Sequence, residues 1–288
     1  MSKIYELGLY EKAMPANLSW QEKFEFAKKS GFDYIELSID EKDEKLARLD
    51  WNKAERTNLR NLSFELDCPL KSMCLSGHRR FPLGDPDPKK REKSLEIMQK
   101  AIDLAYDLGI RIIQLAGYDT YYDEGTKETE ALFAQNLAIA CKMAAKKGVT
   151  LGFETMETPF MDTVAKAMHY VSLINNPYLG VYPDIGNLQN ASLIYGKSAT
   201  EDIKTGRGHI VAAHLKETIP NHYREIPFGT GHTAYHETIT ELLGQGVRTF
   251  VGEFWYIGSE SWQDDLVFAA TFLREKLDKA VTELKLEI

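Results

Sequence analysis

Four side chains of the metal-ligand type close four apolar runs in the second half of the sequence. They are Glu154 of "LGFE", Asp184 of "VYPD", His214 of "VAAH" and Glu253 of "FVGE", separated by 30, 30 and 39 residues. Each separation is about the length of one strand–helix unit. Because the carboxyl ends of successive parallel strands face one rim of a barrel, we expect these side chains to converge there.

Two glutamates, an aspartate and a histidine form a mixed oxygen and nitrogen donor set that leaves coordination positions open. Such a set suits one divalent ion in a catalytic role, with Zn²⁺ or Mn²⁺ favoured and Mg²⁺ or Co²⁺ also compatible. A single carboxylate at a strand end is more often a helix cap or a salt-bridge partner. Four ligand types at four successive strand ends nevertheless favour a shared metal site.

A second acid, Glu157, follows Glu154 by three residues and lies in the loop before Pro159. This loop position leaves three interpretations open. Glu157 hydrogen-bonds a substrate hydroxyl, holds a neighbouring side chain of the site, or is a loop acid exposed to solvent.

The elements that position these residues alternate along the whole chain. Short apolar runs predict strands, and longer amphipathic patterns between them predict helices. Strict alternation indicates a parallel sheet with right-handed crossovers, and eight units in 288 residues predict one α/β domain over 1–288, a single (β/α)8 TIM barrel. The expected strands are 3–10, 33–39, 70–76, 111–117, 149–154, 179–184, 210–216 and 249–254. The expected helices are 19–31, 50–67, 88–109, 126–148, 163–174, 200–208, 233–244 and 261–277, the sixth being the weakest because glycines interrupt it.

Composition excludes several classes of function. The net charge is −8, with 43 acids against 35 bases, which argues against a nucleic-acid partner because phosphates require basic surface. No run approaches the roughly 20 apolar residues of a membrane span, and the first residues do not resemble a signal peptide. The three cysteines, Cys68, Cys74 and Cys141, share no metal-ligand spacing, which is typical of reduced thiols in a cytoplasmic protein.

Motifs throughout the chain resemble the xylose-isomerase-like barrel superfamily, which also holds ketose 3-epimerases and endonuclease IV. Within it the chain is similar to the L-ribulose-5-phosphate 3-epimerase family, also called L-xylulose-5-phosphate 3-epimerase, of ascorbate and pentose catabolism. The resemblance covers almost the whole sequence, and "CLSGHRRFPLG" (74–84) is more specific than the metal set, which the whole superfamily shares. Further matching stretches are "GLYEKAMP", "GFDYIELSIDEKDEKLARLDW", "IRIIQLAGYD", "NNPYLGVYPDIGNL", "GHIVAAHLKET" and "IPFGTGH".

The resemblance implies a metal-dependent isomerase that acts on a ketopentose phosphate. It implies that Glu154, Asp184, His214 and Glu253 bind the ion, and that Glu154 and Glu253 are also the catalytic acid and base. Epimerisation removes the C3 proton and returns it to the opposite face through an enediolate, which requires a carboxylate on each side. A homodimer is the family-like expectation for the assembly.

A phosphorylated substrate requires cationic side chains on this acidic protein. His78 and Arg79 follow the third expected strand, and Lys216 and Arg224 lie near the seventh, so we expect these four to contact the substrate or its phosphate. Ketose 3-epimerases of free sugars carry a histidine three residues after the aspartate, whereas this chain has Asn187, which favours the sugar-phosphate branch. "FGTGHTA" (228–234) is interpreted as a loop whose backbone N–H groups face an anion.

Two alternative functions stay open within the same superfamily. One is an aldose–ketose isomerase of the hexulose-6-phosphate isomerase type, which would exchange a proton at C1 of the ketose rather than at C3. The other is a metal-dependent phosphodiesterase of the endonuclease IV type, which uses three zinc ions and additional histidines at strand ends. Most other histidines of this chain fall in expected helices or loops, which favours one ion.

Overall fold

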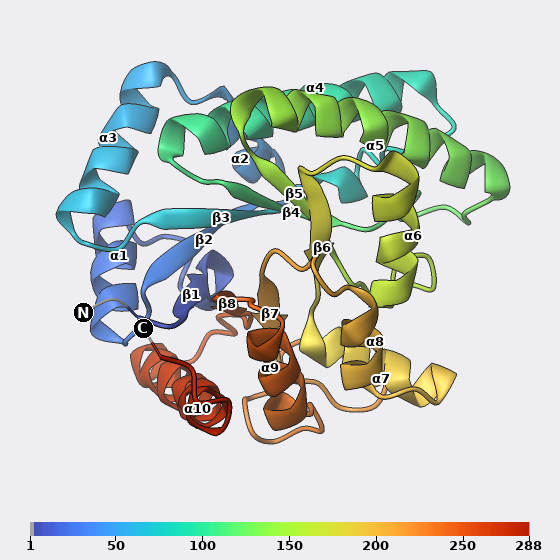
Figure 1. Cartoon of the computed structure of the whole chain (residues 1–288). Helices are drawn as coiled ribbons and strands as arrows, with labels where there is room; N and C mark the ends of the chain where they lie inside the picture. The colour runs from blue at the N-terminus through green and yellow to red at the C-terminus, as the bar shows by residue number, and fades with distance from the viewer. Residues whose placement is uncertain (1–2, 288) are drawn as a thin grey trace.

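A computed structural model describes residues 3–287, which form an eight-stranded, all-parallel sheet rolled into a barrel with helices around it (Figure 1). The strand order is β6-β5-β4-β3-β2-β1-β8-β7: β1 pairs with β8, and all sequence neighbours are adjacent except β6 and β7, which stand at the two ends of the order. The predicted (β/α)8 fold is confirmed. The strands are β1 Glu6–Tyr10, β2 Tyr34–Ile39, β3 Leu70–Leu75, β4 Ile112–Ala116, β5 Thr150–Glu154, β6 Leu179–Tyr182, β7 Ala213–Leu215 and β8 Thr249–Gly252.

The barrel closes between β6 and β7 more weakly than elsewhere. The two strands meet only through isolated parallel bridges, Val181 with Ile210 and Asp184 with His214. Strand β7 has three residues, fewer than the 210–216 expected from the sequence. The second bridge matters for the site because it places two of the expected metal ligands opposite each other.

The helices begin and end largely where capping signals predict. Ser19 caps α1 in a capping box with Glu22, and Gly109 ends α4 in the left-handed conformation with φ +85°. None of the helices within residues 3–287 combines the length and apolar content needed to cross a bilayer. The helices are α1 Trp20–Lys29, α2 Asp43–Leu46, α3 Lys53–Glu65, α4 Pro88–Leu108, α5 Lys127–Lys147, α6 Val164–Ile174, α7 Ile185–Tyr195, α8 Ala199–Thr205, α9 Tyr235–Gly244 and α10 Trp262–Glu283, with 3₁₀ turns η1 Glu11–Ala13, η2 Ala47–Asp50 and η3 Gly77–Arg79.

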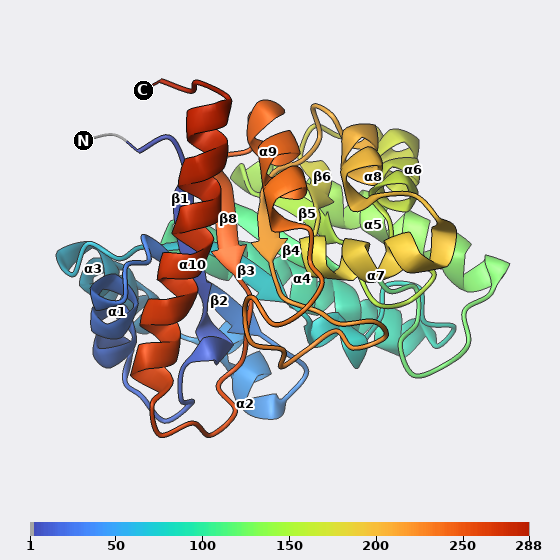
Figure 2. The same ribbon diagram turned by 90° about the horizontal axis from the view of Figure 1, so that it is seen from below.

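Three helical segments differ from the sequence expectation. The sixth unit contains two helices, α7 and α8, because Asp184 caps α7 and Gly196 ends it with φ +66°. The expected helix 50–67 is α3, preceded by α2 and η2 in the loop after β2. Helix α10 continues to Glu283, beyond the expected end at 277, and packs against α9 and β8. It crosses in front of β1 in the view of Figure 2, and the Tyr5 hydroxyl, just before β1, donates to Asp278 at 2.6 Å.

The strands bury different side chains on their two faces. On β2, Ile35, Leu37 and Ile39 belong to the large apolar core between barrel and helices. The alternate residues point into the barrel, where Tyr34 packs in a separate cluster. The Tyr34 ring fills the space over Gly8, where a Cβ would lie 2.3 Å from its carbon atoms. Polar side chains therefore enter the barrel interior only from the same alternate positions.

A buried carboxylate organises the loops after β1 and β2. Glu11 is 1% exposed and binds Lys23 at 2.8 Å, Lys45 at 2.9 Å and Arg48 at 2.7 Å, so three segments converge on it. Burial alone would raise the Glu11 pKa, but the Arg48 hydrogen bonds and the nearby cations outweigh it and hold the pKa far below its ordinary value. This network fixes the loop that carries Lys12 to the mouth of the barrel.

We expect Glu11→Gln to lower the free energy of unfolding by about 3–5 kcal/mol, because buried Lys23 and Lys45 lose their counter-charge. The Glu11 pKa is lower in the folded state, so its contribution is complete above the unfolded value of about 4.3 and disappears only as pH falls through the folded value. Urea unfolding from neutral to acid pH measures this. Asp50→Asn, which removes an exposed 2.7 Å pair with Lys100, is the control and should change little.

Candidate active site

Four potential metal ligands converge at the carboxyl ends of the strands. One ligand atom from each of Glu154, Asp184, His214 and Glu253 lies within 4.8 Å of every other, and all four residues are buried. Within residues 3–287 this is the one His, Cys, Asp and Glu group with such geometry. The convergence expected from the strand-end spacing is therefore present.

Asp184 is fixed by the start of α7. Its Oδ1 accepts the backbone N–H of Gly186 at 2.8 Å and of Asn187 at 2.9 Å, and its own N–H donates to Thr155 Oγ1 at 3.0 Å. One carboxylate oxygen thus caps the helix and the other, Oδ2, is left for the cluster. The same residue therefore caps the helix and serves the site.

His214 lies between carboxylates on both sides of its ring. Its Nδ1 is 3.2 Å from Glu154 Oε1 and 3.6 Å from Glu253 Oε2, and its Nε2 is 2.7 Å from Glu36 Oε1. Burial alone would lower the His214 pKa, but the surrounding carboxylates, led by Glu36 and Glu253, raise it well above its ordinary value. The Nδ1 edge of the ring therefore faces the cluster.

The two glutamates lie in different electrostatic surroundings. Burial and the charge of Glu253 raise the pKa of Glu154, whose other oxygen accepts a hydrogen bond from Gln114. Burial would also raise the Glu253 pKa, but Lys216 at 3.3 Å and His214 lower it to about 2. The pair therefore differs in its affinity for a proton although both side chains are buried.

The cluster has the properties of a cation site. Asp184 Oδ2 and Glu253 Oε2 are buried and make no hydrogen bond, although Lys216 Nζ lies near both. Burial raises the pKa of Asp184 to about 7 despite the opposing effect of Lys216. Two buried anionic oxygens that share one ammonium, beside a histidine nitrogen, fit a divalent ion, since buried negative charge is costly unless positive charge compensates it.

Two of these ligands, Glu154 and Glu253, line a cavity of about 210 Å³ whose walls are mainly polar and charged side chains. Five expected substrate contacts line it: Arg79, Glu157, Asn187, Lys216 and Arg224. Glu157 accepts from Arg224 at 2.8 Å and from the Tyr118 hydroxyl at 3.1 Å. Of the three interpretations of Glu157, its contacts favour the second, in which it holds neighbouring side chains.

Two of the expected contacts are placed differently. His78 is buried away from the cavity, its Nε2 lies 3.2 Å from the Ser94 carbonyl oxygen, and burial lowers its pKa to about 4. The η3 turn directs His78 towards α4 and Arg79 towards the cavity. The expectation that His78 contacts substrate is therefore not supported. Lys216 does line the cavity, but its ammonium pairs with Asp184 at 2.6 Å, which makes it part of the cluster rather than a phosphate ligand.

The loop 228–234 also differs from its sequence interpretation. Its N–H groups do face an anion, but that anion is the protein's own Glu217, which accepts from Gly229 at 2.8 Å and from Thr233 at 3.1 Å. Gly231 is required here because a Cβ would lie 2.1 Å from the Thr218 oxygen. These N–H groups therefore already have an acceptor within the protein, and the loop offers no phosphate site.

Several residues of the site escape prediction from the sequence. Glu36 and Gln114 lie in the middle of apolar strands, and the signal that could have found them is a polar side chain within "YIELSI" and "IIQLA". Lys12 and Trp255 also line the cavity.

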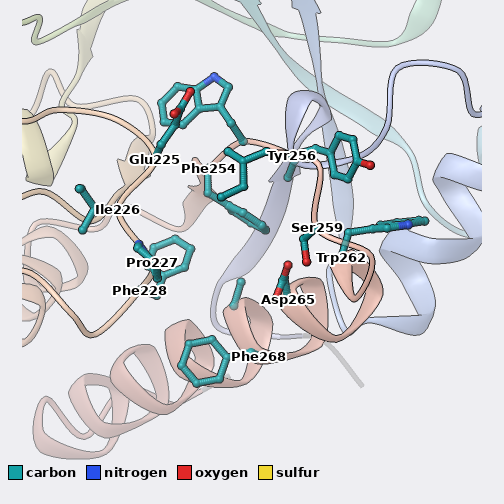
Figure 3. Close-up of a pocket in the computed structure, with 14 residues that line it drawn as sticks. Glu225, Ile226, Pro227, Phe228, Phe254, Tyr256, Ser259, Trp262, Asp265 and Phe268 are labelled. Carbon is teal, nitrogen blue, oxygen red and sulfur yellow. The ribbon is translucent and has the colours of Figure 1, made fainter.

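A second, apolar cavity lies beside the first, between the 225–228 loop, the segment after β8 and α10 (Figure 3). Phe228, Phe254 and Phe268 surround it, and its few polar groups include Ser259 and Asp265. It lacks a cluster of ionisable groups, so the chemistry belongs to the polar cavity. Glu225 and Trp255 contribute to both cavities.

Comparison with known proteins agrees with this geometry. The model of the family described as "Xylose isomerase-like TIM barrel" matches residues 24–276, a range that contains all four potential ligands. The chain therefore belongs to the xylose isomerase-like TIM barrel family. Within it, L-ribulose-5-phosphate 3-epimerase UlaE of Shigella sonnei (strain Ss046) is 42% identical over 283 residues, 98% of each chain. The protein of the same name from Escherichia coli (strain SMS-3-5 / SECEC) is 41% identical over 97% of this chain and 98% of its own.

Solved structures share the fold at low sequence identity. D-psicose 3-epimerase from Clostridium cellulolyticum H10, with D-tagatose, superposes with a TM-score of 0.79 at 17% identity, over 94% of this chain and 99% of its own. An L-ribulose 3-epimerase gives 0.76 at 16% identity, over 98% and 97%. These similarities establish the barrel architecture.

Metal binding should release protons and weaken as pH falls. The raised pKa values of Asp184, Glu154 and His214 mean that, without a metal ion, these side chains keep their protons to higher pH than usual, and an ion must displace them. Titration calorimetry of the chelator-treated protein with Mn²⁺, in buffers of different ionisation enthalpy, measures this between about pH 6 and 8. Affinity that does not change with pH would contradict the expectation.

Proposed function

We propose that the protein is a metal-dependent 3-epimerase that interconverts L-ribulose 5-phosphate and L-xylulose 5-phosphate by proton transfer at C3. The observation that carries the proposal is the convergence of Glu154 and Glu253 with Asp184 and His214 at one cavity. The names of relatives at 41–42% identity over nearly the full chain support the same reaction and substrate. We infer that Glu154, Asp184, His214 and Glu253 would hold one divalent ion, Zn²⁺ or Mn²⁺ being best matched to the donors.

The ion would supply Lewis-acid stabilisation of the negative charge that develops on the substrate oxygens beside C3. The remaining chemistry belongs to the two glutamates. The proton must leave one face of the carbon and arrive at the other, which requires one carboxylate as base and one carboxylic acid as donor. Reversal of the reaction exchanges the two roles.

The electrostatics support a starting assignment of these roles. Burial and Glu253 raise the Glu154 pKa, so Glu154 retains a proton more readily. Although burial opposes it, Lys216 and His214 lower the Glu253 pKa, so Glu253 stays ionised. A carboxyl pair with divergent proton affinities supplies an acid and a base together at neutral pH.

The cavity also carries positive charge suited to a phosphate. The Arg79 guanidinium lies over the rings of Tyr118 and Tyr121, at 5.9 and 5.2 Å, and its buried Nε has no hydrogen-bond acceptor. Arg224 and Lys12 line the same cavity. A planar guanidinium with an unused donor is well suited to a phosphate oxygen, so we assign the phosphate contact chiefly to Arg79.

The cytoplasmic location stays a prediction from the spacing of the three cysteines. The homodimer stays a prediction, which light scattering of the purified protein would test.

The reaction is tested by incubating L-ribulose 5-phosphate in D₂O with the protein and Mn²⁺. The Mn²⁺ is then removed and NMR spectra of the sugar phosphates are recorded. Deuterium should appear at C3 together with L-xylulose 5-phosphate, and chelation before the reaction should abolish both. Deuterium at C1 instead would identify an aldose–ketose isomerase.

Glu154→Gln and Glu253→Gln should each reduce the rate of C3 exchange by about 10²–10⁴-fold, because each removes one partner of the proton transfer. Glu225→Gln changes a carboxylate that lines the same cavity outside the cluster and should retain nearly full exchange. If either cluster variant exchanges C3 at the wild-type rate, the two-carboxylate mechanism is wrong.

Arg79→Gln should lower kcat/KM for the phosphorylated ketose by about 10- to 100-fold, the loss of one charge-assisted hydrogen bond. Activity on unphosphorylated L-ribulose should change little. Arg80→Gln is the matched control, because Arg80 is the neighbouring residue but is exposed and pairs with Asp43. Equal losses on both substrates would contradict the phosphate assignment.

A further inference from the structure

A carboxylate beneath the four-residue cluster plays no part in the reaction proposed above. Glu36 is the third residue of β2, is fully buried and points into the barrel interior. Its Oε1 lies 2.7 Å from His214 Nε2, on the ring edge opposite the cluster. A carboxyl group buried in this position requires an explanation, because burying a polar group is unfavourable unless its hydrogen bonds are satisfied.

The Glu36 carboxylate is itself held in place. Its Oε2 accepts the hydroxyl of Ser72 at 2.7 Å and the hydroxyl of Tyr182 at 2.9 Å, from β3 and β6. Both donors are fully buried. Side chains from two other strands thus fix the carboxylate, and its remaining oxygen is directed at His214.

This arrangement decides which nitrogen of His214 carries the proton. A neutral imidazole donates from one nitrogen and accepts at the other, and an ionised carboxylate can only accept. Nε2 therefore donates to Glu36, and Nδ1 presents its lone pair towards Glu154 Oε1 and Glu253 Oε2. When the ring is neutral, as a metal ligand must be, the atom that faces the cluster is therefore the unprotonated one.

We infer that Glu36 is a positioning residue that makes His214 bind the divalent ion through Nδ1. The inference rests on the metal site of the proposed function and extends it to a residue outside the ligand set. A carboxylate bonded to the far nitrogen of a metal-binding histidine fixes the ring and strengthens the ligand, and its loss lowers metal affinity by about 10- to 100-fold.

The first test uses the unaltered full-length protein, labelled with ¹⁵N at histidine. On addition of Zn²⁺, long-range ¹H–¹⁵N spectra should show the His214 proton on Nε2 and the metal-dependent shift on Nδ1. Protonation of Nδ1 with the metal shift on Nε2 would overturn the inference.

The second test measures Mn²⁺ affinity of Glu36→Gln by titration calorimetry, with an expected loss of about 10- to 100-fold. Ser38→Ala is the matched control, since Ser38 is equally buried two positions along the same strand and does not contact His214. Its metal affinity should equal that of the wild type. Wild-type affinity in Glu36→Gln would show that Glu36 is only structural, and if that variant does not fold, the spectra of the unaltered protein decide.

These results separate the inference from the proposed function. An enzyme that exchanges deuterium at C3 and binds metal through Nε2 would retain the function and lose the inference. A protein whose His214 signals do not respond to Zn²⁺ would lose both.

Discussion

The structure at the mouth of the barrel depends on the close approach of three buried carboxylates, whose ligand atoms lie within 4.8 Å of one another. At such separations in a low-dielectric interior, like charges repel by several kcal/mol, so the arrangement persists only with compensating positive charge. The chain supplies part of it through Lys216, through His214 and through the N-terminus of α7, which binds Asp184. A divalent ion bound to these donors would supply the remaining positive charge.

Several site residues serve the fold and the chemistry together. Asp184 caps α7 with one oxygen and offers the other to the cluster. Glu157 joins Arg224 to Tyr118 and so orders the wall of the cavity. Because these side chains have structural partners, the site is organised before any ligand arrives, which reduces the reorganisation that binding requires.

The four cluster residues could be predicted because a simple rule links sequence to position: strand ends of a parallel barrel share one rim. Glu36 could not, since its importance comes from His214, 178 positions away, and no local pattern reports that contact. His78 and Arg79 are adjacent, yet a single 3₁₀ turn sends them to opposite environments. Helix α7 was missed because the residue that caps it was recognised only as a ligand.

The weak pairing between β6 and β7 gives the cluster a structural role, because its residues lie on both of these segments. Asp184 lies on one of these segments and His214 on the other, joined by a single backbone bridge. In the proposed enzyme, an ion bound by both side chains would cross-link the β6 and β7 segments. Loss of that ion would lower the local stability between β6 and β7, so that the backbone amides there exchange with solvent first. Binding of the ion and the stability of this part of the barrel would then be linked.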